Sequence, residues 1–212
     1  KVENEEGTSY GIDRMVRTDS DQTLTDADSN VDFTTVIGGQ TWMAENLRTT
    51  KYNNGAAIPG IADGEAWNKL ITPAFCWSDN DSLSFSRSGA IYNWYTVSTG
   101  KLCPSGWHVP SATEWSDLFI NVAGRENELI APDYEFYNDY LWDSRLNQSG
   151  FSADMARMRD AEGYFGVNGY SHFWTSSESN SDEAGSAMMY FDYTGQNKGS
   201  KRSGYQVRCL KD

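Results

Sequence analysis

Large aromatic side chains constrain the fold of this chain more than any other feature of its sequence. The 212 residues include eight Trp, twelve Tyr and nine Phe, so rings supply much of the apolar bulk. Nineteen Gly indicate many tight turns between short elements. This composition is typical of a turn-rich, loop-rich domain with an aromatic core, and it disfavours a helical bundle.

Length and charge limit what the chain can be and what it can bind. A chain of 212 residues suffices for one well-cored domain with a short appendage. Lys and Arg number 17 against 30 Asp and Glu, which gives a net charge of −13. Such a charge repels phosphate backbones and anionic membrane surfaces, so we expect neither nucleic acid nor a lipid surface as a direct partner.

The first thirty residues differ from the rest. Acidic residues outnumber basic ones there, and apolar residues are sparse and aperiodic. Such a stretch cannot bury enough surface to offset the entropy lost on ordering. We interpret residues 1–30 as an acidic N-terminal tether or linker and residues 31–212 as the domain. The alternative is an arm that docks on the domain through Tyr10, Ile12, Met15 and Val16.

One helix has a clear start signal. Ser111-Ala-Thr-Glu114 is a capping box, in which Ser111 and Glu114 each bind the backbone amide of the other. The apolar residues that follow recur on one helix face: Trp115, Leu118, Phe119 and Val122. The pattern predicts a helix over residues 112–123.

Weaker signals indicate the other elements. A hairpin is expected at 33–43 around Gly38-Gly39, and short helices at 87–97 and 133–147. After Gly163 we expect strands at 164–167, 172–177, 186–193 and 205–210, with the polar run 194–203 as a turn. Helices in the first half and antiparallel strands in the second predict an α+β fold with paired terminal strands.

Several motifs occur in the order found in one family. They are Val36-Ile-Gly-Gly-Gln-Thr-Trp-Met-Ala-Glu-Asn-Leu47, Phe75-Cys-Trp77, Gly89-Ala-Ile-Tyr-Asn-Trp-Tyr95, Leu102-Cys-Pro-Ser-Gly-Trp-His-Val-Pro110, Glu114-Trp115, Gly150-Phe-Ser-Ala153, Phe173-Trp-Thr-Ser-Ser-Glu178 and Gly204-Tyr-Gln-Val-Arg-Cys-Leu-Lys-Asp212. Over about residues 33–212 the chain resembles the Fibrobacter succinogenes major paralogous domain, a family abundant in exported proteins and lipoproteins of Bacteroidetes and Fibrobacteres. It departs from the family at residues 154–159, where Leu-Pro-Gly-Gly-Tyr-Arg is usual.

The resemblance implies a fold and a location. It implies a C-type-lectin-like fold, with short helices packed on a twisted antiparallel sheet and the termini close together. Formylglycine-generating enzymes and the variable proteins of diversity-generating retroelements have related folds. It also implies an exported protein on the outer membrane or cell surface, held by a lipid on a Cys that precedes this chain. We expect membrane contact only through that anchor.

The resemblance also implies a disulfide between Cys103 and Cys209, since both positions carry Cys in the family. Closing a loop of about 100 residues would stabilise the fold by roughly 4–5 kcal/mol. We expect Cys76 to stay reduced and buried beside Trp77. Two alternatives remain open: both residues are small buried hydrophobes, or Cys76 pairs with one of them.

A short acidic segment is the one candidate metal site. Asp79, Asn80 and Asp81, flanked by Ser78 and Ser82, offer the oxygen ligands that Ca²⁺ prefers. The segment lacks the Gly and the distal Glu of an EF-hand loop. The alternative is an Asx-turn, and we expect no cofactor other than this calcium.

No sequence pattern marks a catalytic site. His108 and His172 each have aromatic or apolar neighbours, so we interpret both as structural. The sequence has no HExxH, GxSxG or P-loop motif and no Ser-His-Asp order. Formylglycine-generating chemistry needs two nearby reactive cysteines, and a bridge between Cys103 and Cys209 leaves only Cys76. We therefore expect no enzymatic activity.

Aromatic residues outside the family motifs are the candidate ligand-binding residues: Trp67, Trp142, Tyr137 and Tyr140. Amphipathic rings concentrate at binding surfaces, and the alternative is small local cores under long loops. The sequence thus favours a non-catalytic recognition or adhesion module of the cell surface that binds an unidentified glycan or protein. An enzyme derived from the formylglycine-generating type of fold and a purely structural envelope protein are the rival hypotheses.

Overall fold

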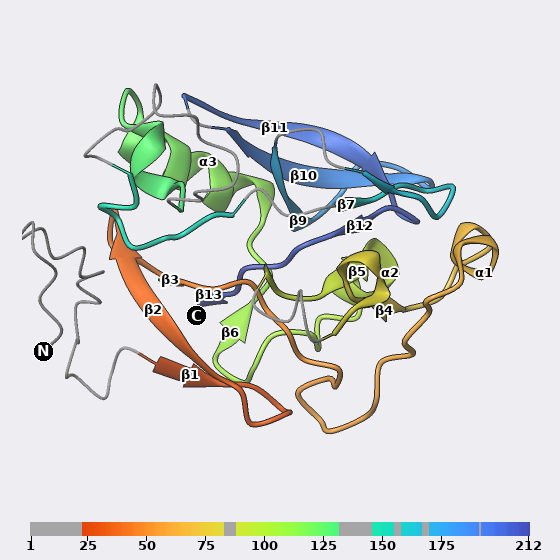
Figure 1. Cartoon of the computed structure of the whole chain (residues 1–212). Helices are drawn as coiled ribbons and strands as arrows, with labels where there is room; N and C mark the ends of the chain where they lie inside the picture. The colour runs from red at the N-terminus through yellow and green to blue at the C-terminus, as the bar shows by residue number, and fades with distance from the viewer. Residues whose placement is uncertain (1–22, 83–87, 132–145, 155–157, 167–169, 191) are drawn as a thin grey trace, which may run out of the picture.

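The structure is a computed structural model of the chain, and it describes residues 23–82, 88–131, 146–154, 158–166, 170–190 and 192–212. Three mainly antiparallel sheets and a few short helices make an α+β fold, as predicted (Figure 1). In the described part of the chain, no helix is both long and apolar enough to cross a membrane.

The first sheet brings the end of the chain beside its N-terminal hairpin. Its strand order is β1-β2-β3-β13-β6. Gly38 and Gly39, with φ of 58° and 84°, form the hairpin turn that the sequence predicts. Leu210 pairs with Trp42, so the terminal strands share one sheet as expected. The strands are β1 (Thr23–Thr25), β2 (Val31–Ile37), β3 (Gln40–Met43), β6 (Trp107–His108) and β13 (Leu210–Lys211).

The second sheet, in the order β11-β10-β9, corrects one sequence prediction. Its strands are β9 (Ser171–Glu178), β10 (Glu183–Tyr190) and β11 (Tyr193–Ser200). We predicted one strand over 186–193 followed by a polar turn over 194–203, and this is wrong. The chain reverses between Tyr190 and Tyr193, which pair, and the polar run is itself a strand. β11 is an edge strand that buries few side chains, so it has no hydrophobic pattern.

The third sheet has the order β4-β5-β12-β7-β8. Its strands are β4 (Phe75–Cys76), β5 (Ile91–Asn93), β7 (Met158–Arg159), β8 (Phe165–Gly166) and β12 (Gly204–Tyr205). The predicted final strand over 205–210 is therefore divided between two sheets, as β12 and β13. The predicted helix over 87–97 is likewise shorter, because the Asn93 side chain accepts a bond from Thr96 N and starts the helix only there.

The helices are short: α1 (Gly64–Asn68), α2 (Trp94–Val97) and α3 (Ala112–Val122), with 3₁₀ turns η2 (Ser78–Asn80) and η4 (Glu126–Leu129). The capping box of α3 is confirmed, because Ser111 Oγ accepts from Glu114 N and the Glu114 carboxylate accepts from Ser111 N. The predicted helix over 133–147 lies almost entirely outside the described residues.

Residues 23–30 belong to the domain rather than to a linker. β1 pairs with β2, and the Asp26 carboxylate accepts bonds from Asp28 N and Asn30 N. Asp28 in turn accepts from the backbone amide of Thr50. This segment, which lies before the boundary that we placed at residue 30, is thus part of the first sheet, and its acidic side chains accept bonds from backbone amides. The remaining residues of the proposed tether, 1–22, lie outside the described part of the chain.

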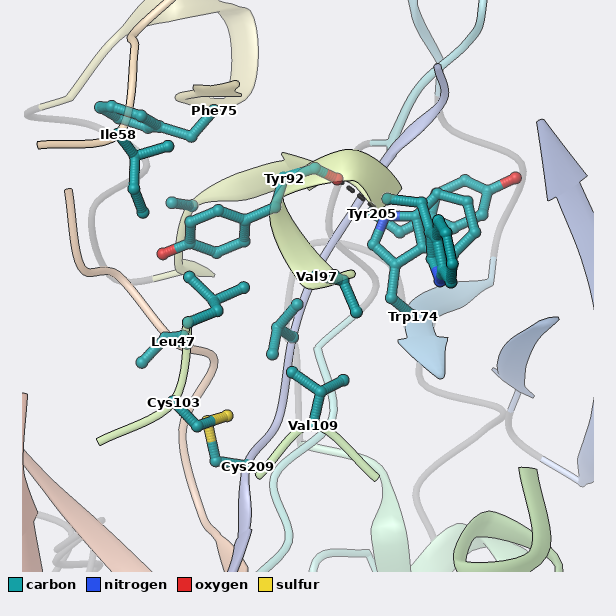
Figure 2. Packing of buried hydrophobic residues seen from close by; sticks show 14 of the residues in the cluster. Leu47, Ile58, Phe75, Tyr92, Val97, Cys103, Val109, Trp174, Tyr205 and Cys209 are labelled. Carbon is teal, nitrogen blue, oxygen red and sulfur yellow. Dashed lines mark hydrogen bonds between the residues drawn. A yellow bond between two sulfur atoms is a disulfide. The ribbon is translucent and has the colours of Figure 1, made fainter. Parts of the chain in front are cut away.

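Aromatic rings fill the core, as the composition predicts. One cluster joins Trp42, Trp115, Phe151 and Phe173, where α3 packs on β9 and β10. A second cluster includes Tyr92, Trp174 and Tyr205 together with the two sulfur atoms of Cys103 and Cys209 (Figure 2). Helix α3 thus covers one face of the β9–β11 sheet, and the second cluster packs against part of the opposite face.

Candidate functional site

Three tyrosines gather at the end of the second sheet, where β10 turns into β11. Tyr190 and Tyr193 are opposite each other in the register of the two strands, and they are 37% and 46% exposed. Their ring centroids lie 5.3 Å and 6.4 Å from the ring centroid of Tyr170, which directly precedes β9. We call Tyr170, Tyr190 and Tyr193 the tyrosine cluster. Its rings form the most exposed aromatic group that these strands carry.

Strand alternation places the cluster on the sheet face that points away from α3. Met188 of β10 pairs with both His172 and Gly195, so residues two positions away, including the three tyrosines, share its face. The opposite face carries Phe173, whose ring stacks on Trp115 of α3 at 5.4 Å. Helix α3 therefore covers one face of the β9–β11 sheet, while the rings of the tyrosine cluster are exposed to solvent at the end of the other face.

Two glycines of β11 make room for aromatic rings. A Cβ added to Gly195 would lie only 2.3 Å from Tyr193 Oη, and one added to Gly199 would lie 2.7 Å from Tyr205 Cε2. The Tyr193 ring therefore extends along β11 over Gly195. Sequence reasoning missed this cluster because it predicted one strand over 186–193, in which alternation would put Tyr190 and Tyr193 on opposite faces. A sequence signal for it does exist: two tyrosines lie on either side of a turn, and Gly195 and Gly199 follow on the same face of the next strand.

A series of rings connects the cluster to the core. The Tyr170 ring lies 6.3 Å from His172, the His172 ring stacks on Tyr205 at 5.1 Å, and Tyr205 lies 4.4 Å from Trp174. Trp174 Nε1 donates to the Tyr92 carbonyl at 2.7 Å, the dashed bond in Figure 2. Burial lowers the pKa of His172 to about 4, so its ring is neutral at neutral pH. The surface rings thus rest on a fixed aromatic stack.

Polar groups of β11 divide between the two sheet faces. Gln196 Nε2 donates to Ala112 O and to Ser116 Oγ, both at 2.7 Å, and fastens the strand to α3. Asn197, on the face of the cluster, is exposed; its Nδ2 makes a long contact of 3.6 Å with Met188 Sδ, and its Oδ1 accepts from Lys198 N at 2.8 Å. Its amide and the tyrosine hydroxyls are suited to hydrogen bonds with a ligand, and the rings to stacking.

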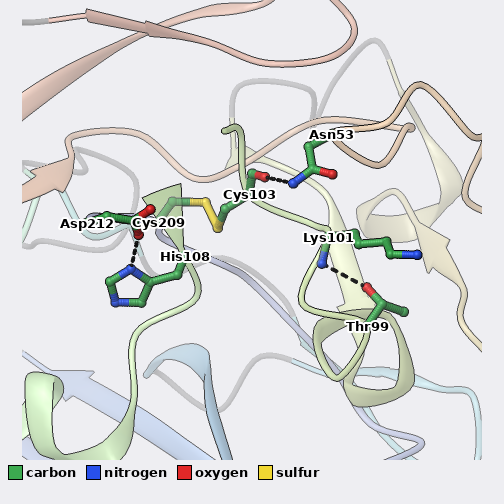
Figure 3. Close-up of a disulfide and its surroundings, with 7 residues drawn as sticks. All are labelled: Asn53, Thr99, Lys101, Cys103, His108, Cys209 and Asp212. Carbon is green, nitrogen blue, oxygen red and sulfur yellow. Dashed lines mark hydrogen bonds and ion pairs between the residues drawn. A yellow bond between two sulfur atoms is a disulfide. The ribbon is translucent and has the colours of Figure 1, made fainter. Parts of the chain in front are cut away.

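The disulfide joins the last strand to the segment before α3. Cys103 and Cys209 have an S–S distance of 2.03 Å and a Cα–Cα distance of 5.9 Å, within the range of an ordinary bridge (Figure 3). Cys76 is the free cysteine and is buried, as we expected. Burial raises the pKa of its thiol to about 11, which makes it a poor nucleophile.

His108 connects the end of the chain to the start of α3. Its Nδ1 lies 2.7 Å from Asp212 Oδ1 (Figure 3). Its Nε2 lies 2.9 Å from Glu114 Oε1. Burial alone would lower the pKa of His108, but its hydrogen bonds to the Asp212 and Glu114 carboxylates outweigh burial and raise the pKa. Burial alone would raise the pKa of Glu114, but the hydrogen bonds that its carboxylate accepts from Ser111 and His108 outweigh burial and lower the pKa. Both ring nitrogens serve this structural contact.

The contact predicts a pH dependence of stability. Because the folded pKa of His108 is raised, its contribution is full below about pH 6.5 and is lost as the pH rises through the folded value. The Glu114 contribution has the opposite sign and is lost as the pH falls through its lowered pKa. We expect His108→Gln to flatten the change in melting temperature between pH 6 and pH 8. Asp212→Asn, which removes one of the two carboxylates, should give a dependence of melting temperature on pH between those of the wild type and His108→Gln. The same dependence in the wild type and His108→Gln would contradict this role.

The candidate calcium segment serves the local turn. Asp79 and Asn80 adopt left-handed backbone conformations in η2, with φ of 48° and 58°. The Asn80 side chain donates to Ala62 O at 2.9 Å and so binds the loop before α1. Among the residues that the structure describes, no three or more His, Cys, Asp and Glu side chains group as a metal site. The geometry favours the turn that we named as the alternative.

Trp67 is part of the core, which corrects its interpretation as a surface ligand-binding residue. Its side chain is 0% exposed, its Nε1 donates to Arg202 O at 2.7 Å, and the Arg159 guanidinium lies 4.6 Å from its ring centroid. The same guanidinium donates to the backbone carbonyls of Ile61, Ala62 and Gly163 and lies 4.8 Å from the ring centroid of Phe165. The other three candidates, Trp142, Tyr137 and Tyr140, lie outside the described residues.

Comparison with known proteins identifies the family. Neither the curated proteins nor the solved structures give a significant match. The sequence profile of the Fibrobacter succinogenes major domain, in contrast, matches residues 36–211 and covers all three sheets except the N-terminal part of the first. The chain therefore belongs to the Fibrobacter succinogenes major domain family.

Proposed function

We propose that the chain is a non-catalytic recognition or adhesion module of the cell surface, and that the tyrosine cluster is its ligand-binding site. The observation that carries the proposal is the exposed pair Tyr190 and Tyr193, held side by side on a sheet. Tyrosine rings offer a large apolar surface and a hydroxyl at low entropic cost, which is why they are enriched at binding surfaces.

The support of the cluster favours recognition, because a binding site works best on a rigid scaffold. Gly195 leaves space for the Tyr193 ring, and Gln196 fastens the same strand to α3. The stacked His172 and Tyr205 rings continue into the core. A ligand that meets these rings would therefore cause little further loss of side-chain freedom.

The reactive side chains of the described residues are poorly placed for catalysis, which supports a non-catalytic module. Cys103 and Cys209 are joined, and the buried Cys76 has a raised pKa. His172 is buried and neutral, and both nitrogens of His108 contact carboxylates. A general base needs a free ring nitrogen and a pKa near the working pH.

We also propose that the protein is exported and carried on the outer membrane or cell surface by a lipid anchor. A disulfide persists in oxidising compartments and is rare in the cytosol. The C-type-lectin-like fold is part of the same proposal. The pairing of β13 with β3, which brings the C-terminal strand beside the N-terminal hairpin, supports it.

A combined screen tests the proposed function. The purified chain is applied to a glycan array and to immobilised surface proteins from host and bacterial cells, and is incubated in parallel with a panel of polysaccharides. We expect saturable binding to a surface ligand and no hydrolysis. Hydrolysis of any polysaccharide would instead favour an enzyme, and binding to no surface component would favour a purely structural envelope protein.

A further inference from the structure

We infer that the tyrosine cluster binds a neutral saccharide chain, an inference that rests on the proposed function and names its ligand. The face of a tyrosine ring has a negative quadrupole, and the face of a pyranose presents C–H groups with partial positive charge, so the two stack. Tyr190 and Tyr193 offer two such rings, at a spacing fixed by the register of β10 and β11.

The polar groups beside the rings suit sugar hydroxyls. Asn197 shares the face of Tyr193 and Gly195. Its side chain is exposed: Nδ2 makes a long contact of 3.6 Å with Met188 Sδ, and Oδ1 accepts a bond from Lys198 N at 2.8 Å. Asn and Tyr side chains both donate and accept hydrogen bonds, as sugar hydroxyls do. Small-molecule sites combine apolar surface with a few such polar groups. The cluster therefore has both parts of a saccharide subsite.

The composition of β11 argues against a protein as the ligand. A stable protein interface buries about 800 Å² on each partner and has large apolar residues at its centre. Tyr193 is the one large apolar side chain of β11, and the other residues are Thr, Gly, Gln, Asn, Lys and Ser. Two exposed rings beside a polar strand form a small binding surface, which suits a few sugar units better than a protein.

Charge decides between neutral and anionic chains. The whole protein carries −13, and the exposed Asp192 lies in the turn between Tyr190 and Tyr193. Lys198, the one cation of β11, falls on the opposite face by strand alternation. Sulfate or uronate groups at the cluster would meet a carboxylate and no cation of this strand, so a neutral saccharide is the ligand that fits.

The test uses defined oligosaccharides and matched tyrosine variants. Neutral cello-, manno-, galacto- and xylo-hexaose are titrated by calorimetry, with heparin fragments and oligogalacturonate as anionic probes. We expect binding of at least one neutral chain, weakened about tenfold or more by Tyr190→Ala and by Tyr193→Ala, a change of about 1.4 kcal/mol each. Tyr164→Ala is the matched control, because Tyr164 is 73% exposed and belongs to no part of the cluster.

A fourth variant separates ring position from ring loss. The Cβ of Gly195→Ala would lie 2.3 Å from Tyr193 Oη, closer than van der Waals contact allows, so the ring must move while every tyrosine remains. We expect this variant to lose binding as Tyr193→Ala does, with the melting temperature measured alongside. Two results would overturn the inference. One is binding of anionic chains alone, and the other is binding of neutral chains by Tyr190→Ala and Tyr193→Ala with the affinity of the wild-type chain. Capture of a surface protein through the tyrosine cluster, with no saccharide bound, would overturn it too but leave the recognition function standing.

Discussion

Replacement of Cys103 and Cys209 by Ser is expected to lower the free energy of unfolding by about 5 kcal/mol. The two residues are separated by 106 positions, so the bridge closes half of the 212-residue chain into a loop and lowers the entropy of the unfolded state. It also fastens β13, a two-residue strand at the end of the chain, to the segment before α3. A fall in melting temperature of about 10–20 °C corresponds to this loss in a domain of this size.

Chemical denaturation with and without a reducing agent measures the effect on the wild-type chain as well. Cys76→Ala is the control, since it removes the free thiol and leaves the bridge. Alkylation of the unfolded, unreduced protein should label Cys76 alone. Three labelled thiols, or equal stability with and without reductant, would contradict the pairing and weaken the argument for export.

Arg208→Ala is expected to cost about 3–5 kcal/mol, although Arg208 contacts no ligand site. Its guanidinium is buried and donates to Asn46 Oδ1 at 2.5 Å, to Ser152 O at 2.8 Å and to the carbonyls of Met43 and Phe151. Burial lowers its pKa to about 9, so it remains charged at neutral pH and depends on these acceptors. Alanine leaves them unsatisfied in the core.

Two further variants make the Arg208 prediction specific. Arg208→Lys keeps the charge but loses the planar fork, so we expect it to recover little of the lost stability. Arg125→Ala removes an exposed arginine that pairs with Glu128, and it should change the free energy of unfolding by about 0.5 kcal/mol or less. Equal stability of Arg208→Ala and Arg125→Ala in urea would contradict the account.

Local signals explain which parts of the fold could be predicted. The capping box and the Gly38-Gly39 turn act within a few residues, so the sequence alone locates α3 and the β2–β3 hairpin. β11 could not be found this way, because its hydrogen bonds to β10 hold it and its side chains bury little. The division of residues 204–211 between two sheets depends on partners far away in the sequence.

The candidate site could not be predicted either, because it depends on contacts between residues far apart in the sequence. The buried place of Trp67 depends on Arg159 and on the Arg202 carbonyl, which are about 90 to 135 residues away in the chain, and no local pattern encodes them. The tyrosine cluster depends on where β10 ends, since a reversal after Tyr190 turns two residues of one expected strand into opposite partners. A one-residue shift in a strand reverses the face of every side chain, so a missed turn conceals a site completely.

The double variant Tyr190→Ala/Tyr193→Ala tests the central claim most directly, because both residues are exposed and neither fills the core. The affinities of the wild-type chain, the double variant and Tyr164→Ala are measured for the surface ligand that the wild-type chain binds. The melting temperatures of the three proteins are measured as well. The account predicts a loss of about a hundredfold or more in the double variant, no loss in Tyr164→Ala and melting temperatures within a few degrees of each other. Undiminished binding by a folded double variant would contradict it.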